Sequence, residues 1–416
     1  MRKNLRTIFL FGAILLIVIL IAASGVLQAG ATYRLTSSQQ LKQAVVSWFI
    51  PPVFEMEKSA AIAVQPEQLI WWNEAVKPSL DFSNDYFQTI FSETGNYFAV
   101  TTLTGRTGNP NQARTFAFTV YSANRAELYS LTFRHFYDQP FPTVVISDQD
   151  GAAVVGHSAT GEIRFYDQSG NLVAEKQLFP SAEYDLERIL DISLSADGSR
   201  VAVAATKRGS APNGSSALHP SGEPHLFLFT PKGEEIRSIP LPGYQTSGCV
   251  ISPNGAFVVA NSYTVESGGS VVRQDQVFNA EGTIVARLDL LFKYAQFSPD
   301  NRSLLLANNS TAKMVDLTTG TIVWRHQISA DQGMITAARV ANEGKVSLLL
   351  VAKNEFRNRA FIFTHPRLMI FNQTGEILQQ IELTDQVFHK PALGLTVDGQ
   401  QISIGFNHSY QIFRVK

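Results

Sequence analysis

The stretch Phe297-Ser298-Pro299-Asp300-Asn301-Arg302-Ser303-Leu304-Leu305-Leu306-Ala307 contains a short strand, a tight polar turn and a second, apolar strand. Asp, Asn and Ser favour turns through local hydrogen bonds, and short apolar runs beside such turns favour buried strands. Similar phrases surround six further turns, which end at Gly95, Gly151, Gly198, Gly255, Gly344 and Gly399. Successive turns lie 43 to 57 residues apart. Strand repeats with this period are typical of radial β-sheet architectures.

A second hairpin phrase alternates with the first. It consists of an apolar strand, a short polar turn that ends in Gly, and an alternating strand, and it occurs at 165–173, 277–285, 315–324 and 370–378. Gly supplies the positive φ that such hairpin turns require. Two hairpins per repeat form one four-stranded antiparallel sheet, so the seven first turns predict an all-β fold of seven such sheets.

On these repeats, the chain from 67 to 416 resembles a seven-bladed β-propeller of the WD-repeat-like or quinoprotein-like superfamily, in which each four-stranded sheet is a blade. The resemblance is one of architecture. The Trp-Asp pair of WD repeats is absent, and its place is taken by Tyr166-Asp167, Phe278-Asn279, Val315-Asp316 and Phe371-Asn372. The resemblance implies one ring-shaped domain. Its quinoprotein branch implies an enzyme with a quinone in a central funnel.

The seventh repeat has only three predicted strands, at 393–396, 401–406 and 410–415. Proteins avoid open sheet edges because unpaired backbone groups there can pair with other chains. The run Gln68-Leu69-Ile70-Trp71-Trp72 resembles the outer strands of the other repeats. We therefore expect 68–72 to complete the last blade and close the ring.

The first 31 residues carry a basic start followed by an apolar run. Arg2, Lys3 and Arg6 precede an uncharged segment from 7 to 26. About 20 apolar residues suit a transmembrane helix, which predicts a signal anchor. Ala29-Gly30-Ala31 also fits a signal-peptide cleavage site, so the segment is either an anchor or a cleaved signal peptide. Both alternatives place the body of the protein outside the cytoplasm.

Residues 32–66 are expected to be a connector with a short helix. Ser37 or Ser38 could cap a helix through Leu41, Val45, Val46 and Trp48, and Pro51-Pro52 would end it. The helix would either pack as a stalk or bind a partner. Residues 67–416 would then form the propeller.

Charge and cysteine content narrow the function classes. The 34 basic and 35 acidic residues nearly cancel, so we expect no nucleic-acid partner. Cys249 is the only cysteine and therefore cannot form an internal disulfide. We expect it to be a buried apolar residue.

The longest connections are expected on one face of the propeller. The two tight hairpin turns of each repeat lie at one end of the sheet, so the other connections lie at the opposite end. Several of these, at 104–113, 207–224, 265–270 and 353–359, are predicted to be long loops rich in Gly, Pro, Ser and Asn, as expected of binding loops on a rigid scaffold. Candidate ligand-binding residues are the basic Arg106, Arg114, Lys207, Arg208, Arg273 and Arg357 and the aromatic Tyr137, Tyr184 and Tyr244.

No motif predicts catalysis. The eight histidines lack metal-ligand spacing, and 156–161 differs from a nucleophile elbow in the position of its second Gly. We therefore expect no catalytic residues, no metal and no cofactor. The expected function is binding of a protein partner or an anionic glycan or wall polymer by a membrane-anchored, extracytoplasmic propeller. The alternatives are a quinoprotein-like enzyme and a structural scaffold of a membrane complex.

Overall fold

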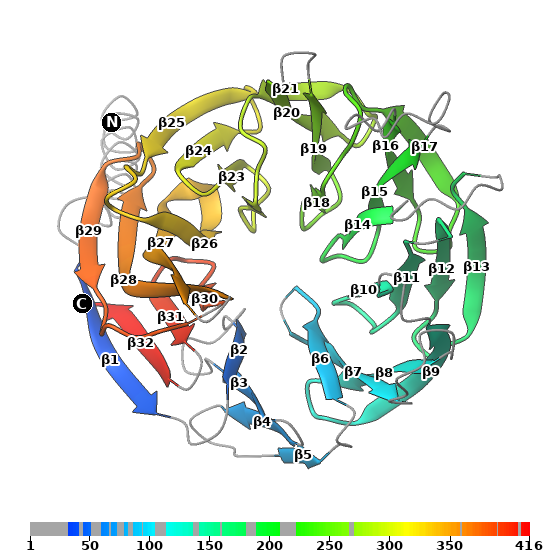
Figure 1. Ribbon diagram of the computed structural model, residues 1–416, viewed down its shortest axis with the longest axis horizontal. Coiled ribbons are helices and arrows are strands. Elements are labelled where there is room, and N and C mark those ends of the chain that lie inside the picture. The colour runs from blue at the N-terminus through cyan, green and yellow to red at the C-terminus, as the bar shows by residue number, and fades with distance from the viewer. Residues whose placement is uncertain are drawn as a thin grey trace, which may run out of the picture.

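The computed structural model describes residues 32–416, apart from 41–44, 51–59, 66–67, 73–78, 82–85, 94, 105–113, 136–140, 159, 180–188, 209–221, 266–269, 358–359, 389 and 407–408. The side chains of 39–88 are not described. Within the described part, the strands form eight four-stranded antiparallel sheets. The sheets stand side by side in a ring, with one edge strand of each toward the centre (Figure 1). This arrangement is a β-propeller architecture.

Seven of the sheets are those predicted from the seven turns, and we number these blades in chain order. Blade one consists of β6 (Tyr86–Phe91), β7 (Tyr97–Thr104), β8 (Arg114–Ser122) and β9 (Glu127–His135). Blade two consists of β10 (Thr143–Ile146), β11 (Ala153–His157), β12 (Glu162–Tyr166) and β13 (Leu172–Gln177). Blade three consists of β14 (Ile189–Leu194), β15 (Val201–Arg208), β16 (Gly222–Phe229) and β17 (Glu235–Pro240). Blade four consists of β18 (Cys249–Ile251), β19 (Phe257–Val265), β20 (Val271–Asn279) and β21 (Ile284–Leu288). Blade five consists of β22 (Tyr294–Phe297), β23 (Ser303–Ala307), β24 (Thr311–Asp316) and β25 (Thr321–Gln327). Blade six consists of β26 (Met334–Val340), β27 (Val346–Arg357), β28 (Ala360–Asn372) and β29 (Ile377–Glu382).

The ring is closed by an N-terminal strand, but a different one from that predicted. Blade seven contains β30 (Ala392–Leu395), β31 (Gln401–Phe406) and β32 (Ser409–Val415), and its outer strand is β1 (Tyr33–Gln40). The predicted closing strand 68–72 is instead β4 (Gln68–Trp72) of another sheet. Tyr33 fixes β1 in the outer position of blade seven. Its hydroxyl donates to Gly399 O at 2.5 Å, its N–H donates to Gln379 Oε1, and its carbonyl accepts from Gln379 Nε2.

The eighth sheet was not predicted. It consists of β2 (Val45–Ile50), β3 (Ala60–Gln65), β4 and β5 (Ser79–Asp81), and β2 contacts β30 and β31 of blade seven. The prediction of seven blades is therefore one sheet short. The sheet lacks the Ser-and-Asp turn by which the other blades were recognised in the sequence, so the repeat count could not include it.

The helix predicted in the connector is also wrong. Residues 33–40 and 45–50 are strands β1 and β2. Val45, Val46, Trp48, Phe49 and Ile50 are β-branched or aromatic, and such residues favour a pleated strand. Within the described residues no helix has the length and apolarity needed to cross a membrane. The predicted signal anchor, at 1–31, lies outside them.

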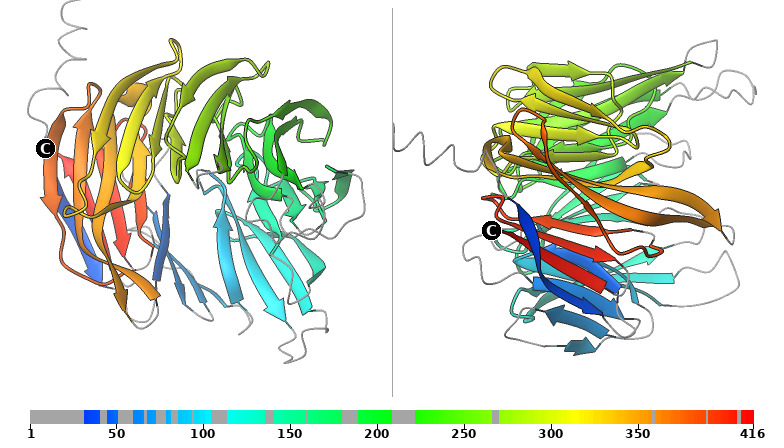
Figure 2. Two further views of the ribbon diagram at one scale, coloured as in Figure 1. Left: turned by 45° about the horizontal axis from the view of Figure 1, so that its top comes forward. Right: turned by 90° about the vertical axis from the view of Figure 1, so that its left-hand side faces the viewer.

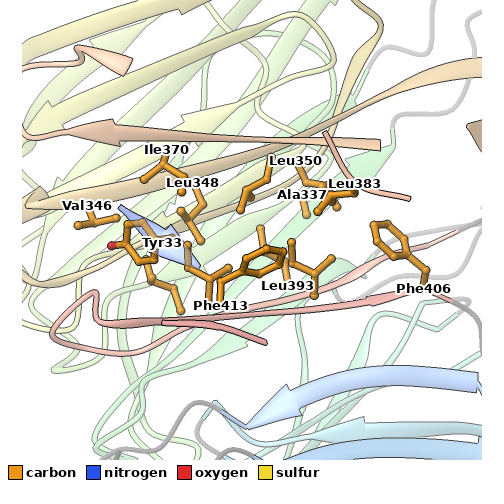
Figure 3. Close-up of a cluster of buried hydrophobic side chains, with 14 of the residues drawn as sticks. Tyr33, Ala337, Val346, Leu348, Leu350, Ile370, Leu383, Leu393, Phe406 and Phe413 are labelled. Atoms are coloured by element: carbon orange, nitrogen blue, oxygen red, sulfur yellow. The ribbon is translucent and has the colours of Figure 1, made fainter. Parts of the chain in front are cut away.

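Burial changes systematically from the centre of each sheet to its outer edge. The second strands β23, β27 and β31 begin with continuous buried runs, because neighbouring sheets cover both of their faces. The outer strands β13, β17 and β29 are mostly exposed. The core therefore consists of separate apolar layers between adjacent blades. One layer joins blades six and seven through Leu348, Leu350, Ile370, Leu393 and Phe406, with Tyr33 at its edge (Figure 3).

The recurring turn is held by one side-chain arrangement. In blade five, Ser298 Oγ donates to Asp300 Oδ1 at 2.6 Å and accepts the Ser303 N–H at 2.9 Å. Thr396 makes the equivalent bonds to Asp398 and Gln401 in blade seven. The turn of blade one has no Asp at this position, and Ser92 instead donates to Asp148 of blade two at 2.6 Å. The repeated phrase thus satisfies buried turn groups with side chains.

Candidate functional site

The hairpin order places two kinds of connection at opposite ends of the blades. Consecutive strands pair antiparallel in blades one to six, so the first and third connections share one end and the others share the opposite end. We call these ends the turn face and the loop face. The turn face carries the short repeated turns, and the loop face carries the long connections. The loop face is therefore the candidate binding surface.

Some of the predicted loops on the loop face are strand extensions. β19 and β20 remain paired to Val265 and Val271, and β27 and β28 remain paired to Arg357 and Ala360. The stretch 353–359, predicted to be an irregular loop, thus forms most of a two-stranded ribbon with 360–364. We call 353–364 the blade-six ribbon. In the side view of Figure 2, β27 and β28 extend beyond the neighbouring sheets.

The blade-six ribbon is fixed at its base by the connection that leads to blade seven. Phe363 and Phe388 exchange two backbone hydrogen bonds, at 2.8 and 3.0 Å. Phe388 is fully buried, and its ring lies 4.7 Å from that of Phe406. A β-bulge lies opposite Ala352, and there His365 adopts a left-handed φ of 51°. Its N–H donates to Asp385 Oδ1 at 2.8 Å, so the bulge is held from outside the ribbon.

The described side chains of the first ribbon strand, 353–357, are polar apart from Phe356. Arg357 Nη2 lies 2.5 Å from Glu355 Oε2, and Thr364 Oγ1 donates to Glu355 Oε1 at 2.8 Å. The Thr364 hydrogen bond and the Arg357 charge hold the pKa of Glu355 below its usual value. Phe356 is 64% exposed, the largest value among the exposed apolar side chains of the described residues. The ribbon therefore presents a ring beside a compensated ion pair.

Tyr244 and Arg273 lie on adjacent segments between blades three and four. Tyr244 N–H donates to Tyr263 O at 3.0 Å, and Arg273 lies opposite Tyr263 in the β19–β20 pair. Lys207 Nζ lies 3.4 Å from Glu223 Oε2 on the paired strand. Tyr244 and Arg273 are exposed. Tyr244 and Arg273 therefore share one region of the loop face, whereas the Lys207–Glu223 pair lies beside His225, which packs against Phe179 between blades two and three.

The other predicted residues lie elsewhere. Arg357 is on the blade-six ribbon, and Arg114 is half-buried at the start of β8, opposite His135. Arg208 ends β15, and nothing is described of its side chain. Arg106, Tyr137 and Tyr184 fall outside the described residues. The structure thus brings two of the nine candidates, Tyr244 and Arg273, together.

Sequence reasoning missed the exposed apolar side chains of the loop face. Besides Phe356, these are Val271, Val272 and Val387, which are 44 to 49% exposed. The consecutive Val271 and Val272 at the start of a strand were the available signal, because a strand end that passes beyond its neighbours exposes both faces. The candidates predicted from the sequence were basic and tyrosine residues, so these valines were not among them.

Two half-buried ionisable groups of the ring, His157 and Asp191, pack against structural neighbours. Burial lowers the pKa of His157 to about 4, and its ring packs edge-on against Phe133 at 5.2 Å. Burial raises the pKa of Asp191 to about 6, although its carboxylate accepts the Cys249 N–H of the next blade at 3.1 Å. The part of the chain that the structure describes contains no group of three or more His, Cys, Asp or Glu side chains placed to hold a metal ion.

Comparison with known proteins gives no family for this chain: no family model matches it, and no curated protein matches it. The function of the loop face must therefore be inferred from its own residues. Its two distinctive regions are the blade-six ribbon and the contact between blades three and four.

Proposed function

We propose that this protein binds a protein partner through its loop face, as a propeller held outside the cytoplasm by its N-terminal apolar segment. The observation that carries the proposal is the blade-six ribbon, which extends beyond the sheets and presents Phe356 with 64% of its surface exposed. Exposed aromatic side chains on a rigid support are frequent anchors of protein interfaces. The likeness to WD-repeat-like or quinoprotein-like propellers is part of this proposal.

A protein partner suits the described charges better than an anionic polymer does. Two of the predicted basic residues, Lys207 and Arg357, are each paired with a Glu of their own blade. A polyanion binds through uncompensated basic charge, whereas a protein interface combines apolar anchors with a polar rim. The polymer alternative predicts that Arg208→Glu together with Arg357→Glu abolishes capture of polyglutamate.

A scaffold function would use a different surface. Exposed apolar side chains also lie at the starts of the outer strands: Leu172, Val173, Ile236, Ile322, Val323 and Ile377. One or two of them lie on the rim of each of blades two, three, five and six. The rim therefore supplies matched apolar positions against which the loop face can be tested.

Site-specific photocrosslinking tests the proposed function. Benzoylphenylalanine is placed at position 356 or, as a control, at the similarly exposed Ile322 of the rim, in the full chain expressed in its own cells. We expect one discrete crosslinked protein from position 356, and its loss when Val271 and Val272 are also changed to Ser. Crosslinks from position 322 alone would support the scaffold alternative. Equal, diffuse crosslinking from both positions would contradict specific binding.

The proposed location is tested by thiol labelling. Lys232 lies in an exposed turn, and Cys249, the only native cysteine, is buried. Lys232→Cys should therefore be labelled by a membrane-impermeant maleimide on intact cells, with little background from wild-type protein. Labelling only after lysis would place the propeller inside and overturn this part of the proposal.

A further inference from the structure

At the turn-face end of the central strands, an arginine is withdrawn from solvent without a close counter-ion. Arg339 is the sixth of seven residues in β26, the innermost strand of blade six, and it is half-buried. Its Nη1 donates to Ala338 O at 2.9 Å, which is the only hydrogen bond of its guanidinium to described residues. Since a guanidinium carries five N–H donors, most of its hydrogen-bonding capacity is unused.

A carboxylate approaches the same place from the opposite side of the ring. Glu93 lies in the first turn of blade one, and its Oε1 accepts the Gln296 Nε2–H of blade five at 3.4 Å. Blades one and five face each other across the centre (Figure 1). Burial lowers the pKa of Arg339, and the Glu93 charge opposes this effect. No described carboxylate lies within 4.0 Å of the Arg339 guanidinium.

Other polar groups of the inner strands are already engaged. Asp191 accepts the Cys249 N–H, and Ser193 Oγ accepts the Ile251 N–H at 3.0 Å, so both link blade three to blade four. Arg339 makes no such link between blades. A half-buried charge that has neither full hydration nor a paired counter-charge is costly, and an anion that contacts it would relieve that cost.

We propose that Arg339 binds a small oxyanion, the carboxylate or phosphate group of a soluble ligand, at the turn-face end of the ring centre. The planar fork of a guanidinium matches two oxygens of either group. The Gln296 amide, which now donates to Glu93 and to Phe297 O at 3.4 Å each, could donate to the oxyanion once Glu93 is displaced. Glu93 opposes binding through its negative charge, so it limits affinity and favours ligands that can displace it. This site is separate from the loop face and does not depend on the proposed function.

Ligand-dependent thermal stability of the detergent-solubilised full chain tests the site. Sodium phosphate and sodium succinate are titrated from roughly 0.1 to 30 mM against sodium chloride of equal ionic strength, which separates phosphate from carboxylate ligands. The variants are Arg339→Gln, Glu93→Gln and, as a matched control, the exposed Arg273→Gln. Glu93 is exposed in its turn, so Glu93→Gln should fold normally.

We expect at least one of the two anions to raise the melting temperature of the wild-type protein and of Arg273→Gln equally. Arg339→Gln should weaken the apparent affinity about tenfold or more, because a charged hydrogen bond is lost, and Glu93→Gln should strengthen it. If Arg339→Gln does not fold, the Glu93→Gln result still decides. An unchanged affinity in Glu93→Gln, equal shifts in all variants, or no shift with either anion would each overturn the proposal.

Discussion

The turn face and the loop face are ends of the same blades, but they are stabilised in different ways. On the turn face, one Ser or Thr and one Asp or Asn bond to each other and to the turn backbone in blades three, four, five and seven. On the loop face, each described connection has its own solution: a Phe363–Phe388 backbone pair at blade six, and a Tyr244–Tyr263 pair between blades three and four.

The difference shows how a repeat scaffold can present a variable surface. The turn-face bonds join residues two to five positions apart, so each turn is held locally and its sequence recurs. The loop-face bonds join segments about 20 to 25 residues apart, so the connections can change length without disturbing the turns. This is the division of labour expected when binding loops stand on a rigid fold.

The substitution expected to reduce stability most lies at the base of the blade-six ribbon on the loop face. Phe388→Ala removes a fully buried ring that packs on Phe363 at 5.6 Å and Phe406 at 4.7 Å. We expect a loss of about 3–5 kcal/mol in the free energy of unfolding, measured by urea titration with tryptophan fluorescence. The neighbouring Val387→Ala, at an exposed site, should change stability by less than about 0.5 kcal/mol. Equal losses would mean that the base of the ribbon is not packed as described.

The next effect tests the contact between blades on the turn face. Gly320 has a left-handed φ of 69°, and a Cβ there would lie 2.2 Å from Val285 O of the preceding blade. Gly320→Ala should therefore cost about 3 kcal/mol, since both strain and a backbone clash result. Gly198→Ala is the control, because its φ is 66° but the nearest atom would be Ser147 Oγ at 3.1 Å. We expect about 1 kcal/mol there; similar losses for both would exclude blade contact as the cause.

A smaller loss in the free energy of unfolding is expected when the hydroxyl of the recurring turn is removed. Ser298→Ala removes the bond to Asp300 and leaves the buried Ser303 N–H without its acceptor. The expected cost is about 2 kcal/mol in the same urea assay. Ser169→Ala, at an exposed turn position, should be nearly neutral. A neutral Ser298→Ala would mean that the recurring phrase reflects backbone preference alone.

Local chemistry explains which parts of the fold could be predicted. The turn residues act within five positions of one another, so sequence predicted the seven turns and their four-stranded sheets. The closing strand could not be chosen, because 33–40 and 68–72 are both short stretches that form strands. The choice depends on Gln379 and Gly399, more than 300 residues from Tyr33.

The candidate site was harder to predict for a similar reason. Tyr244 and Arg273 lie on neighbouring segments only because the segment after β17 bonds to β19. The exposure of Phe356 depends on how far β27 and β28 extend beyond β26, which pairs with β27 only as far as Ala352. Neither fact can be read from spacing along the chain.

The stability of the loop-face side of blade four is expected to depend on pH through Asp275. Asp275 of β20 is fully buried on the loop-face side of blade four, and its Oδ1 accepts the Phe292 N–H of the next connection at 3.2 Å. Its Oδ2 has no hydrogen-bond partner among the described residues, and burial raises its pKa from 3.8 to about 7. The nearby Lys313 charge only partly opposes this shift. Ionising Asp275 is therefore unfavourable in the folded state.

Between pH 3.8 and about 7, the folded protein holds a proton on Asp275 that the unfolded chain has released. The stabilisation from this proton is complete below the lower value and is lost as pH rises through the higher one, with a slope of at most about 1.4 kcal/mol per pH unit. Asp275→Asn keeps an acceptor for Phe292 and removes the titration. Urea unfolding of both proteins at several pH values should show wild-type stability falling relative to Asp275→Asn across this window. Parallel curves would mean that Asp275 stays ionised, so that the connection between blades four and five is held by a charge, unlike the hydroxyl-centred turns of the opposite face.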